Sequence, residues 1–281
     1  MFTADPSGSF VAYESPDRTI QVFYADGTPD GPRIKPGFRS GLWPAAISPR
    51  RGLVWVASFD RGTLRCYDWR TGELRWERRD AYKKLASLDC CGERTLLVGQ
   101  YSRRGITGPL RALDQETGEE LEGALSGVAS AFAQSDNPWI VLTRRNRIEF
   151  RHDLSAAPRW SFDTGTMEMI AALDGDLALV SQVGGLVKCF DLSRGDERWR
   201  FDCGEGSMLA CPVLPSGAGF AFGLKRHQDE GGRGSPVFFD LLDGRILRTE
   251  PELQYPVGNV VNRGHTLIGR TGRVRLPGME W

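Results

Sequence analysis

Short apolar stretches, each closed by a turn, recur about every 40 residues along the whole chain, a spacing typical of repeat architectures. The two clearest copies lie at residues 64–76 and 187–199. In the first copy an apolar strand ends at Asp68, Gly72 follows four residues later, and Trp76 follows eight residues after the Asp. This pattern, called the cassette below, predicts a strand, a tight turn and a second strand.

Weaker copies of the cassette keep the Asp and the Gly but lack the Trp, at Asp114 with Gly118 and at Asp240 with Gly244. Repeats of about 40 residues that consist only of strands and turns are typical of β-propellers, so the sequence predicts that architecture. The aspartates recur because a tight turn needs a side-chain acceptor, and we therefore expect them to have a structural role.

Seven pairs of short apolar segments extend this register along the chain, and a third strand follows each pair. The first members are residues 2–5, 45–48, 85–88, 129–132, 169–173, 209–213 and 258–261. Their partners are residues 10–13, 53–57, 95–98, 139–142, 177–180, 219–222 and 266–269. The third strands are residues 19–24, 63–68, 110–114, 147–153, 186–191, 236–240 and 273–276. More polar fourth strands end most units, at residues 74–78, 159–163, 197–202 and 245–249.

Four strands that run from apolar to polar make one blade, from its inner edge to its outer edge. We therefore predict an all-β chain with a single domain over residues 1–281, built as a seven-bladed β-propeller of four-stranded antiparallel blades. Six blades are the alternative if the two ends of the chain do not form a full blade. The chain starts with an innermost strand and ends at Trp281, so closure of the ring is expected to depend on packing alone.

The run from Tyr67 to Trp76 resembles the tryptophan-docking motif of quinoprotein-like propellers, in which the Trp packs onto the neighbouring blade. The opening residues 2–12 look like the start of a WD40-type blade. Both resemblances concern architecture, because such propellers include dehydrogenases, assembly factors and interaction scaffolds.

Quinoprotein dehydrogenases carry adjacent cysteines beside their pyrroloquinoline quinone, and Cys90 and Cys91 are adjacent here. The alternative is that the two cysteines lie in the turn between the first two strands of the third blade. Those enzymes are longer and are exported, so we expect no quinone cofactor. The three histidines lie in different blades without the spacing of metal ligands, so we expect no metal either.

The chain has 281 residues, and its 36 Lys and Arg balance its 36 Asp and Glu. A formal charge near zero argues against nonspecific nucleic-acid binding, which needs a basic domain or stripe. No apolar run approaches the ~20 residues that span a bilayer, and the N-terminus lacks the pattern of a secretory signal. We therefore expect a cytoplasmic protein without membrane contact and with reduced cysteines. The excess of Arg over Lys indicates a bacterial genome.

Blade topology sorts the loops onto two faces. The turns between first and second strands, and between third and fourth strands, share one face and carry mostly acids. The loops between second and third strands and the crossings to the next blade share the other, here called the basic loop face, which carries mostly Arg and Lys. Arg with Tyr and Trp is favoured at protein interfaces, so this face is predicted to bind a protein partner with an acidic surface. The candidate partner-binding residues are Arg61, Tyr101, Arg103, Arg104, Arg144, Arg145, Lys225, Arg226, Trp43 and Tyr82.

No phosphate-binding loop, dinucleotide fingerprint or Gly-x-Ser-x-Gly motif occurs in a supporting context. The leading hypothesis is a non-catalytic interaction scaffold that is monomeric before it binds its partner. An immunity protein that neutralises a toxin is a specific form of that hypothesis. The alternatives are a quinone-dependent enzyme that resembles the dehydrogenases and a sensor that binds a carbohydrate or a nucleotide.

Overall fold

A computed structural model gives the structure of this chain. It describes residues 2–5, 9–24, 26–38, 42–58, 62–79, 85–100, 109–121, 124–128, 130–134, 137–144, 146–163, 168–182, 186–202, 207–209, 214–215, 220–227, 234–240, 242–249, 257–261, 266–269 and 272–275. The chain separates into two compact units, one of residues 1–142 with 151–159 and one of residues 143–150 with 160–281. The prediction of a single domain remains a prediction.

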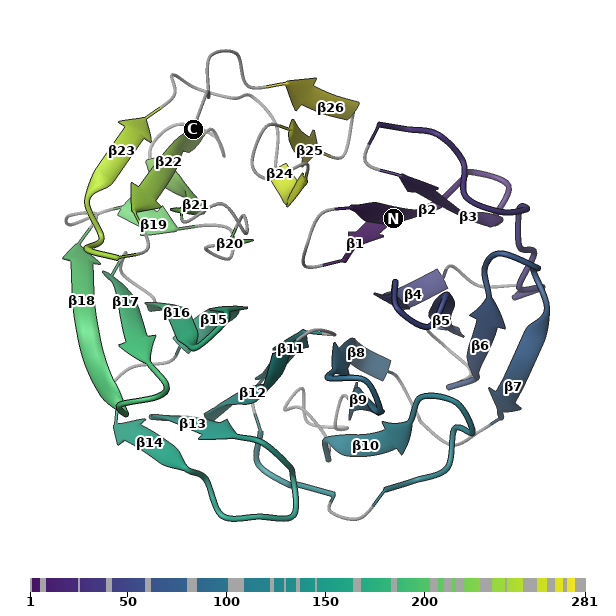
Figure 1. Ribbon diagram of the computed structural model, residues 1–281, viewed down its shortest axis with the longest axis horizontal. Helices are drawn as coiled ribbons and strands as arrows, with labels where there is room; N and C mark the ends of the chain where they lie inside the picture. Colours follow the sequence, from purple (N-terminus) through teal and green to yellow (C-terminus); the bar gives the residue numbers. More distant parts are fainter. Residues whose placement is uncertain are drawn as a thin grey trace. The chain divides into compact units, whose positions relative to one another are not determined.

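All regular structure among the described residues is β-strand (Figure 1). The first unit holds β1 (Phe2–Ala4), β2 (Phe10–Glu14), β3 (Ile20–Tyr24), β4 (Leu42–Ser48), β5 (Leu53–Ser58), β6 (Leu64–Asp68), β7 (Leu74–Arg78), β8 (Leu85–Cys91), β9 (Thr95–Gln100), β10 (Arg111–Asp114), β11 (Ser130–Gln134) and most of β12 (Asn137–Arg144). The second unit holds most of β13 (Arg147–Arg151), β14 (Trp160–Asp163), β15 (Glu168–Asp174), β16 (Leu177–Gln182), β17 (Leu186–Asp191), β18 (Asp196–Asp202), β19 (Ser207–Leu209), β20 (Leu214–Pro215), β21 (Phe220–His227), β22 (Gly234–Asp240), β23 (Ile246–Thr249), β24 (Val257–Val261), β25 (Thr266–Gly269) and β26 (Gly272–Arg275).

Strands that follow one another in the sequence pair with one another, as in a chain that folds back and forth. Within the described residues the strand orders are β1-β2-β3, β4-β5-β6-β7, β8-β9-β10, β11-β12-β13-β14, β15-β16-β17-β18, β19-β21-β22-β23 with β20 beside β21, and β24-β25-β26. The pairings are antiparallel, as in β2 with β3 and β17 with β18. The expected all-β, antiparallel organisation is therefore confirmed.

Burial decreases from the inner strands of a sheet to its outer strand. Every residue of β5 is buried, whereas β7 has exposed and half-buried residues only. In β18 the residues alternate between more and less exposed along most of the strand, and Trp199 is its buried position. A strand with neighbours on both sides loses its contact with water, and an outer strand keeps one edge in water, so the apolar-to-polar gradient in the sequence matches the strand order.

Two of the sheets replace a regular fourth strand with a looser segment. In the first sheet, β3 is bridged to the following segment through Ile20 with Ile34 and Phe23 with Pro29. In the third sheet, Leu110 is bridged to Leu125 and Leu113 to Glu120. The prediction of four-stranded blades therefore holds for the second, fourth and fifth sheets, while these two sheets have three named strands and a bridged edge.

Apolar clusters lie between successive sheets of the first unit. One cluster joins the second and third sheets and includes Trp55, Cys66, Leu96 and Leu113. Another joins the first and second sheets and includes Trp69. No helix among the described residues is long and apolar enough to cross a membrane.

Candidate functional site

The aspartates of the cassette hold the turn between the third and fourth strands. In the second sheet, Oδ1 of Asp68 accepts hydrogen bonds from the backbone N–H groups of Arg70 (3.0 Å) and Thr71 (3.2 Å). The N–H of Gly72 donates to the Asp68 carbonyl at 2.8 Å, with Gly72 at a φ of +78°. Asp114, Asp153 and Asp191 accept the same pair of N–H bonds in their own turns. The predicted structural role of these carboxylates is confirmed.

The second oxygen of the cassette Asp pairs with an arginine. Oδ2 of Asp68 lies 2.7 Å from the guanidinium of Arg75, and Oδ2 of Asp114 lies 2.9 Å from that of Arg94. The aspartate side chains are 14% exposed in both pairs, whereas Arg75 is 52% and Arg94 is 73% exposed. The carboxylates therefore lie beneath their partners, and the guanidinium groups reach the solvent.

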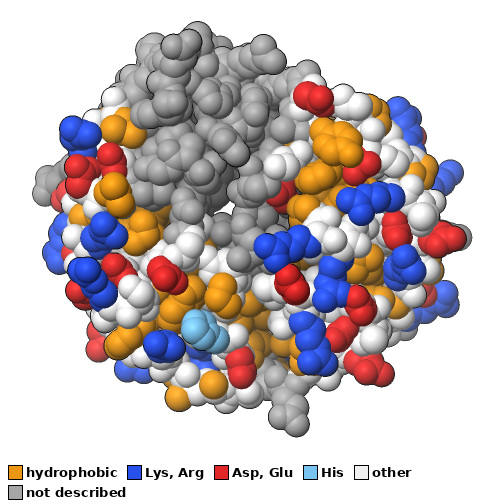
Figure 2. All heavy atoms as spheres, in the orientation of Figure 1, with side chains coloured by type: hydrophobic (Ala, Val, Ile, Leu, Met, Phe, Trp, Pro, Cys, Tyr) orange, Lys and Arg blue, Asp and Glu red, His pale blue; other side chains and the backbone are white. Residues whose placement is uncertain are grey.

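The separation of charge between the two faces remains a prediction, because most loops of the basic loop face lie outside the described residues. At the turns between third and fourth strands, the cassette aspartates are compensated by arginines. Turns of neighbouring sheets are joined in the same way: Arg50 pairs with Glu93 at 2.5 Å, and Arg51 pairs with Glu116. On the face that Figure 2 shows, blue and red side chains of the described residues are interspersed.

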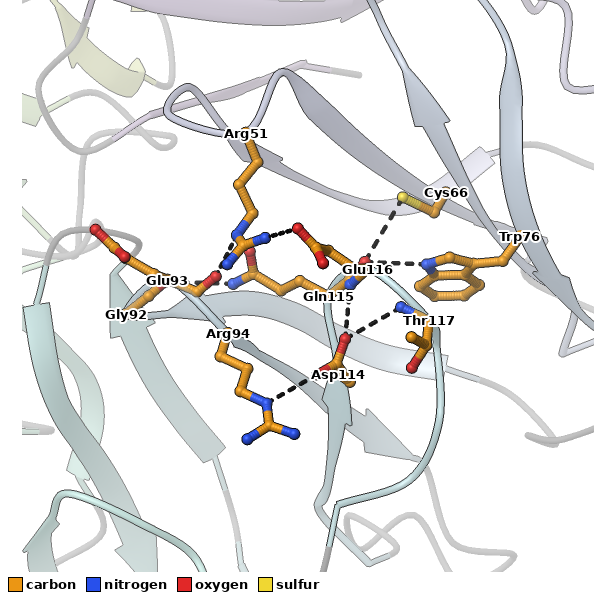
Figure 3. Close-up of polar contacts among 10 residues, drawn as sticks. All are labelled: Arg51, Cys66, Trp76, Gly92, Glu93, Arg94, Asp114, Gln115, Glu116 and Thr117. Carbon is orange, nitrogen blue, oxygen red and sulfur yellow. Dashed lines mark hydrogen bonds and ion pairs between the residues drawn. The ribbon is translucent and has the colours of Figure 1, made fainter.

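The Arg51 pair belongs to a larger contact network between the second and third sheets (Figure 3). The guanidinium of Arg51 also donates to the Glu93 carbonyl. Gln115, which is fully buried, donates from Nε2 to the carbonyls of Gly92 (3.3 Å) and Thr95 (2.9 Å). The backbone carbonyl of Gln115 accepts the indole N–H of Trp76 at 3.0 Å. These contacts hold the second and third sheets together.

The tryptophans pack against the cassette glycine of the next sheet. A Cβ on Gly118 would lie 2.8 Å from the Trp76 ring, closer than real Cβ contacts allow, and the same holds for Gly244 against Trp199. Trp160 makes the third such contact, with Gly195, and donates its indole N–H to the Leu192 carbonyl at 2.7 Å.

The packing of Trp76 and Trp199 on the next sheet agrees with the resemblance to the tryptophan-docking motif. The same packing of Trp160 was not predicted from the sequence. Its own cassette lacks the Gly, and it follows Asp153 by seven residues instead of eight. The dipeptide Arg-Trp was the available signal, since it occurs at Trp76, Trp160 and Trp199 alike.

Cys90 and Cys91 lie at the end of strand β8, so their expected place in a turn is wrong. Neighbouring residues of a strand point to opposite faces of the sheet. Cys90 accordingly packs in the cluster between the second and third sheets, and Cys91 packs in a separate cluster with Ile140 and Leu142. Burial raises the pKa of both thiols, that of Cys91 to about 12. Thiols in this state are poor nucleophiles and metal ligands.

The other described cysteines are packing residues as well. Cys66 and Cys189 occupy the same cassette position and are both fully buried free thiols. Burial raises the pKa of Cys66 well above its ordinary value and that of Cys189 to about 12. Among the described residues, no group of three or more His, Cys, Asp and Glu could hold a metal ion.

Most of the predicted partner-binding residues cannot be placed. Arg61, Tyr82, Tyr101, Arg103, Arg104 and Arg145 lie outside the described residues. Trp43 lies in β4, and Lys225 and Arg226 lie in β21, in positions where only the backbone is described.

Arg144 is the one partner-binding candidate whose side chain is described. It lies at the end of β12, and its Nε donates to Oε1 of Glu149 at 2.8 Å. The Arg144 side chain is 27% exposed and that of Glu149 is 6% exposed. Glu149 is covered and its carboxylate pairs with Arg144, so Arg144 has a structural role in this sheet whether or not it contacts a partner.

Comparisons with known proteins bear on the fold. No protein-family model matches the sequence, and a search of curated proteins gives no match. Among solved structures, a chain of a crystal structure of the mitotic checkpoint complex matches with a TM-score of 0.72 and 14% sequence identity. The match covers 97% of this chain and 84% of that chain.

The chain has a WD40-like β-propeller fold. The predicted β-propeller fold and its antiparallel strands are thus confirmed. The number of blades and the closure of the ring remain predictions. In total 1440 chains of solved structures match, so the fold by itself does not select an activity.

Proposed function

We propose that this chain is a non-catalytic scaffold that binds a protein partner. The observation that supports this most directly is that the described carboxylates of the cassettes and the described thiols are engaged in structural contacts. The carboxylates of the cassettes are bound to turn N–H groups and to arginines, as at Asp68 and Asp114. The described thiols are buried, with raised pKa values. Groups used in this way build a rigid platform rather than a reaction site.

A WD40-like platform presents its loops to other molecules, and loops on a rigid scaffold are the usual place of binding residues. The chain with a similar fold belongs, by its title, to a protein complex. For this chain we propose that the basic loop face, with Arg61, Arg103, Arg104 and Arg145 at its centre, contacts a partner that carries carboxylates. Arg pairs with carboxylates bidentately and stacks on aromatic rings, which gives such a contact specificity as well as charge.

Several further features belong to the same proposal. The protein works in the cytoplasm as a monomer until it meets its partner, and it carries neither quinone nor metal. A toxin-neutralising immunity protein is one specific role that a compact scaffold of this kind suits. The tryptophan docking at Gly118, Gly195 and Gly244 supports a blade construction similar to that of the quinoprotein-like propellers. Seven blades also belong to this proposal.

The first experiment identifies the partner by affinity purification of the tagged protein from its own cells, followed by binding measurements with the purified partner. The variant Arg61→Glu, Arg103→Glu, Arg104→Glu and Arg145→Glu is expected to weaken binding at least a hundredfold, since two or more anchors of about 2 kcal/mol each are lost. Arg144 stays unchanged, because a glutamate there would face the buried Glu149.

The matched control reverses four exposed arginines elsewhere: Arg50, Arg70, Arg159 and Arg200. Either variant changes the formal charge from 0 to −8, because each reversal removes one positive charge and adds one negative charge. Equal binding by the loop-face variant and the wild type would show that the wrong surface was chosen. Stoichiometric pyrroloquinoline quinone in the purified protein would refute the non-catalytic assignment.

A further inference from the structure

The first strand of the third sheet carries a carboxyl in an apolar setting. Asp89 lies in β8 directly opposite Leu97 of β9, and residues that lie opposite one another in paired strands point to the same face. Leu97 is fully buried in the cluster that joins the third and fourth sheets, and Cys91 and Ile140 belong to the same cluster. Side chains alternate along a strand, so Asp89 also shares the face of Cys91. The Asp89 side chain therefore faces the fourth sheet.

Other sheets show that the repeat does not need a carboxyl at this position. The strand registers align Asp89 with Ala46 of the second sheet and Ala172 of the fifth. Each of the three lies opposite the second-strand residue two places after the one that pairs with the cassette Asp. A small apolar residue is therefore sufficient for the sheet, and the carboxyl of Asp89 is a particular property of the third sheet.

The strands around Asp89 hold no charge that could compensate an ionised carboxylate. β4, β5, β9 and β11 pack against β8, and none of them contains a charged or titratable residue. On β8 itself, burial raises the pKa of the Cys90 and Cys91 thiols, which keeps both neutral. Glu93 and Arg94, in the following turn, have ion pairs of their own. Among the described residues, no hydrogen bond or ion pair reaches the Asp89 carboxyl.

Ionisation of this carboxyl places a charge against apolar side chains, which is costly without a partner. Part of the surface of Asp89 stays open, but protein atoms surround the carboxyl, and this burial raises the pKa of Asp89 to about 7. Within the described residues β8 is the edge strand of its sheet, and it meets the fourth sheet through side chains. Separation of β8 from β11 therefore brings water to the carboxylate without breaking a strand pairing.

We infer that the contact between β8 and β11 is a proton-controlled joint, which is packed while the Asp89 carboxyl is neutral and opens locally once it is ionised. The pKa of Asp89 is about 7 in the packed state and has its ordinary value of 3.8 in the open state. Opening therefore releases a proton between these two values, so the joint weakens as the pH rises from 3.8 to about 7 and changes no further above that. From pH 5.5 to pH 8 the opening equilibrium rises about thirtyfold. The joint involves no partner and is independent of the proposed function.

The two adjacent cysteines of β8 measure the opening, because Cys91 faces the joint and Cys90 faces the second sheet. The full chain is labelled slowly with excess methyl methanethiosulfonate, and tandem mass spectrometry separates the two thiols. Each rate is divided by that of an unstructured peptide with the same residues at the same pH. The relative rate of Cys91 is expected to rise about thirtyfold from pH 5.5 to pH 8, whereas that of Cys90 stays constant.

Asp89→Ala installs the residue of the second sheet, and Asp89→Asn keeps the shape of the side chain without its charge. Both variants are expected to abolish the pH dependence at Cys91. Asp163→Ala is the matched control, because the Asp163 side chain is 84% exposed, and it is expected to keep that dependence.

Persistence of the pH dependence in either Asp89 variant would overturn the inference. An equal rise at Cys90 and Cys91 would do so as well, because the whole chain and not the joint would then be opening. In the chain labelled with ¹³C at the Asp carboxyls, the Asp89 signal is expected to titrate near pH 7, and titration near 3.8 would contradict the joint.

Discussion

The contact between Trp76 and Gly118 allows a quantitative test of how successive sheets are held together. Replacing Gly118 with Ala has two separate costs. Gly118 has a φ of +70°, and an L-residue in the left-handed region costs about 1 kcal/mol. The new Cβ would also lie 2.8 Å from two ring carbons of Trp76, whereas ordinary contacts begin at 3.4 Å. The ring therefore has to retreat by about 0.6 Å.

That retreat affects a hydrogen bond of the ring. The indole N–H of Trp76 donates to the Gln115 carbonyl at 3.0 Å (Figure 3), and a shift of this size stretches the bond beyond useful length. A lost hydrogen bond costs about 1 kcal/mol, and the disturbed packing of the ring adds a similar amount. We therefore expect Gly118→Ala to lower the free energy of unfolding by about 3 kcal/mol.

Gly92 is the matched control within the same sheet. It has a φ of +55°, but a Cβ added there meets nothing within 4 Å. Gly92→Ala should therefore cost only the backbone strain, about 1 kcal/mol. Urea unfolding followed by circular dichroism measures both variants, and hydrogen exchange of residues 85–121 checks that the loss occurs in this sheet. In a Trp76→Ala background, the cost of Gly118→Ala should fall to that of Gly92→Ala. Equal costs for the two glycine variants in the wild-type background would refute tryptophan docking as a source of stability.

Three further outcomes follow from ionisable groups. The Ser193 hydroxyl donates a hydrogen bond to the Asp191 carboxylate. This bond is the largest of the effects that hold the pKa of Asp191 below its ordinary 3.8, while desolvation acts in the opposite direction. This stabilisation is present above pH 3.8 and is lost as the pH falls through the folded-state value, so Ser193→Ala should flatten the acid limb of stability measured from pH 6 to pH 2. Burial raises the pKa of Asp89 to about 7, so Asp89→Asn should stabilise the fold on the order of 2 kcal/mol at pH 8 and not at pH 3.5; an equal effect at both pH values would contradict this. Cys66, Cys90, Cys91 and Cys189 should resist iodoacetamide at pH 8 until urea is added, and mass-spectrometric peptide mapping that finds them labelled in the native protein would contradict their burial.

Several structural features could not be predicted from the sequence because they depend on which strands pair and pack in the folded chain. Trp160 contacts Gly195 and Leu192, which are far from it in sequence, and its own cassette lacks the Gly by which the motif is recognised. The compensation of Asp114 by Arg94 requires the pairing of β9 with β10. The same is true of Arg144, whose pairing with Glu149 makes it part of the sheet and not only of a loop.

The sequence by itself determined the class of fold and the chemistry of the turns. Both are local properties: apolar segments of strand length, and an Asp followed by a Gly four residues later, specify a strand and its turn without reference to the rest of the chain. Only the tertiary structure decided that Cys90 and Cys91 belong to opposite faces of β8 and that carboxylates lie beneath arginines at Asp68 and Asp114. Strand ends and side-chain exposure depend on what packs against each residue, and these neighbours come from parts of the chain that local sequence patterns do not identify.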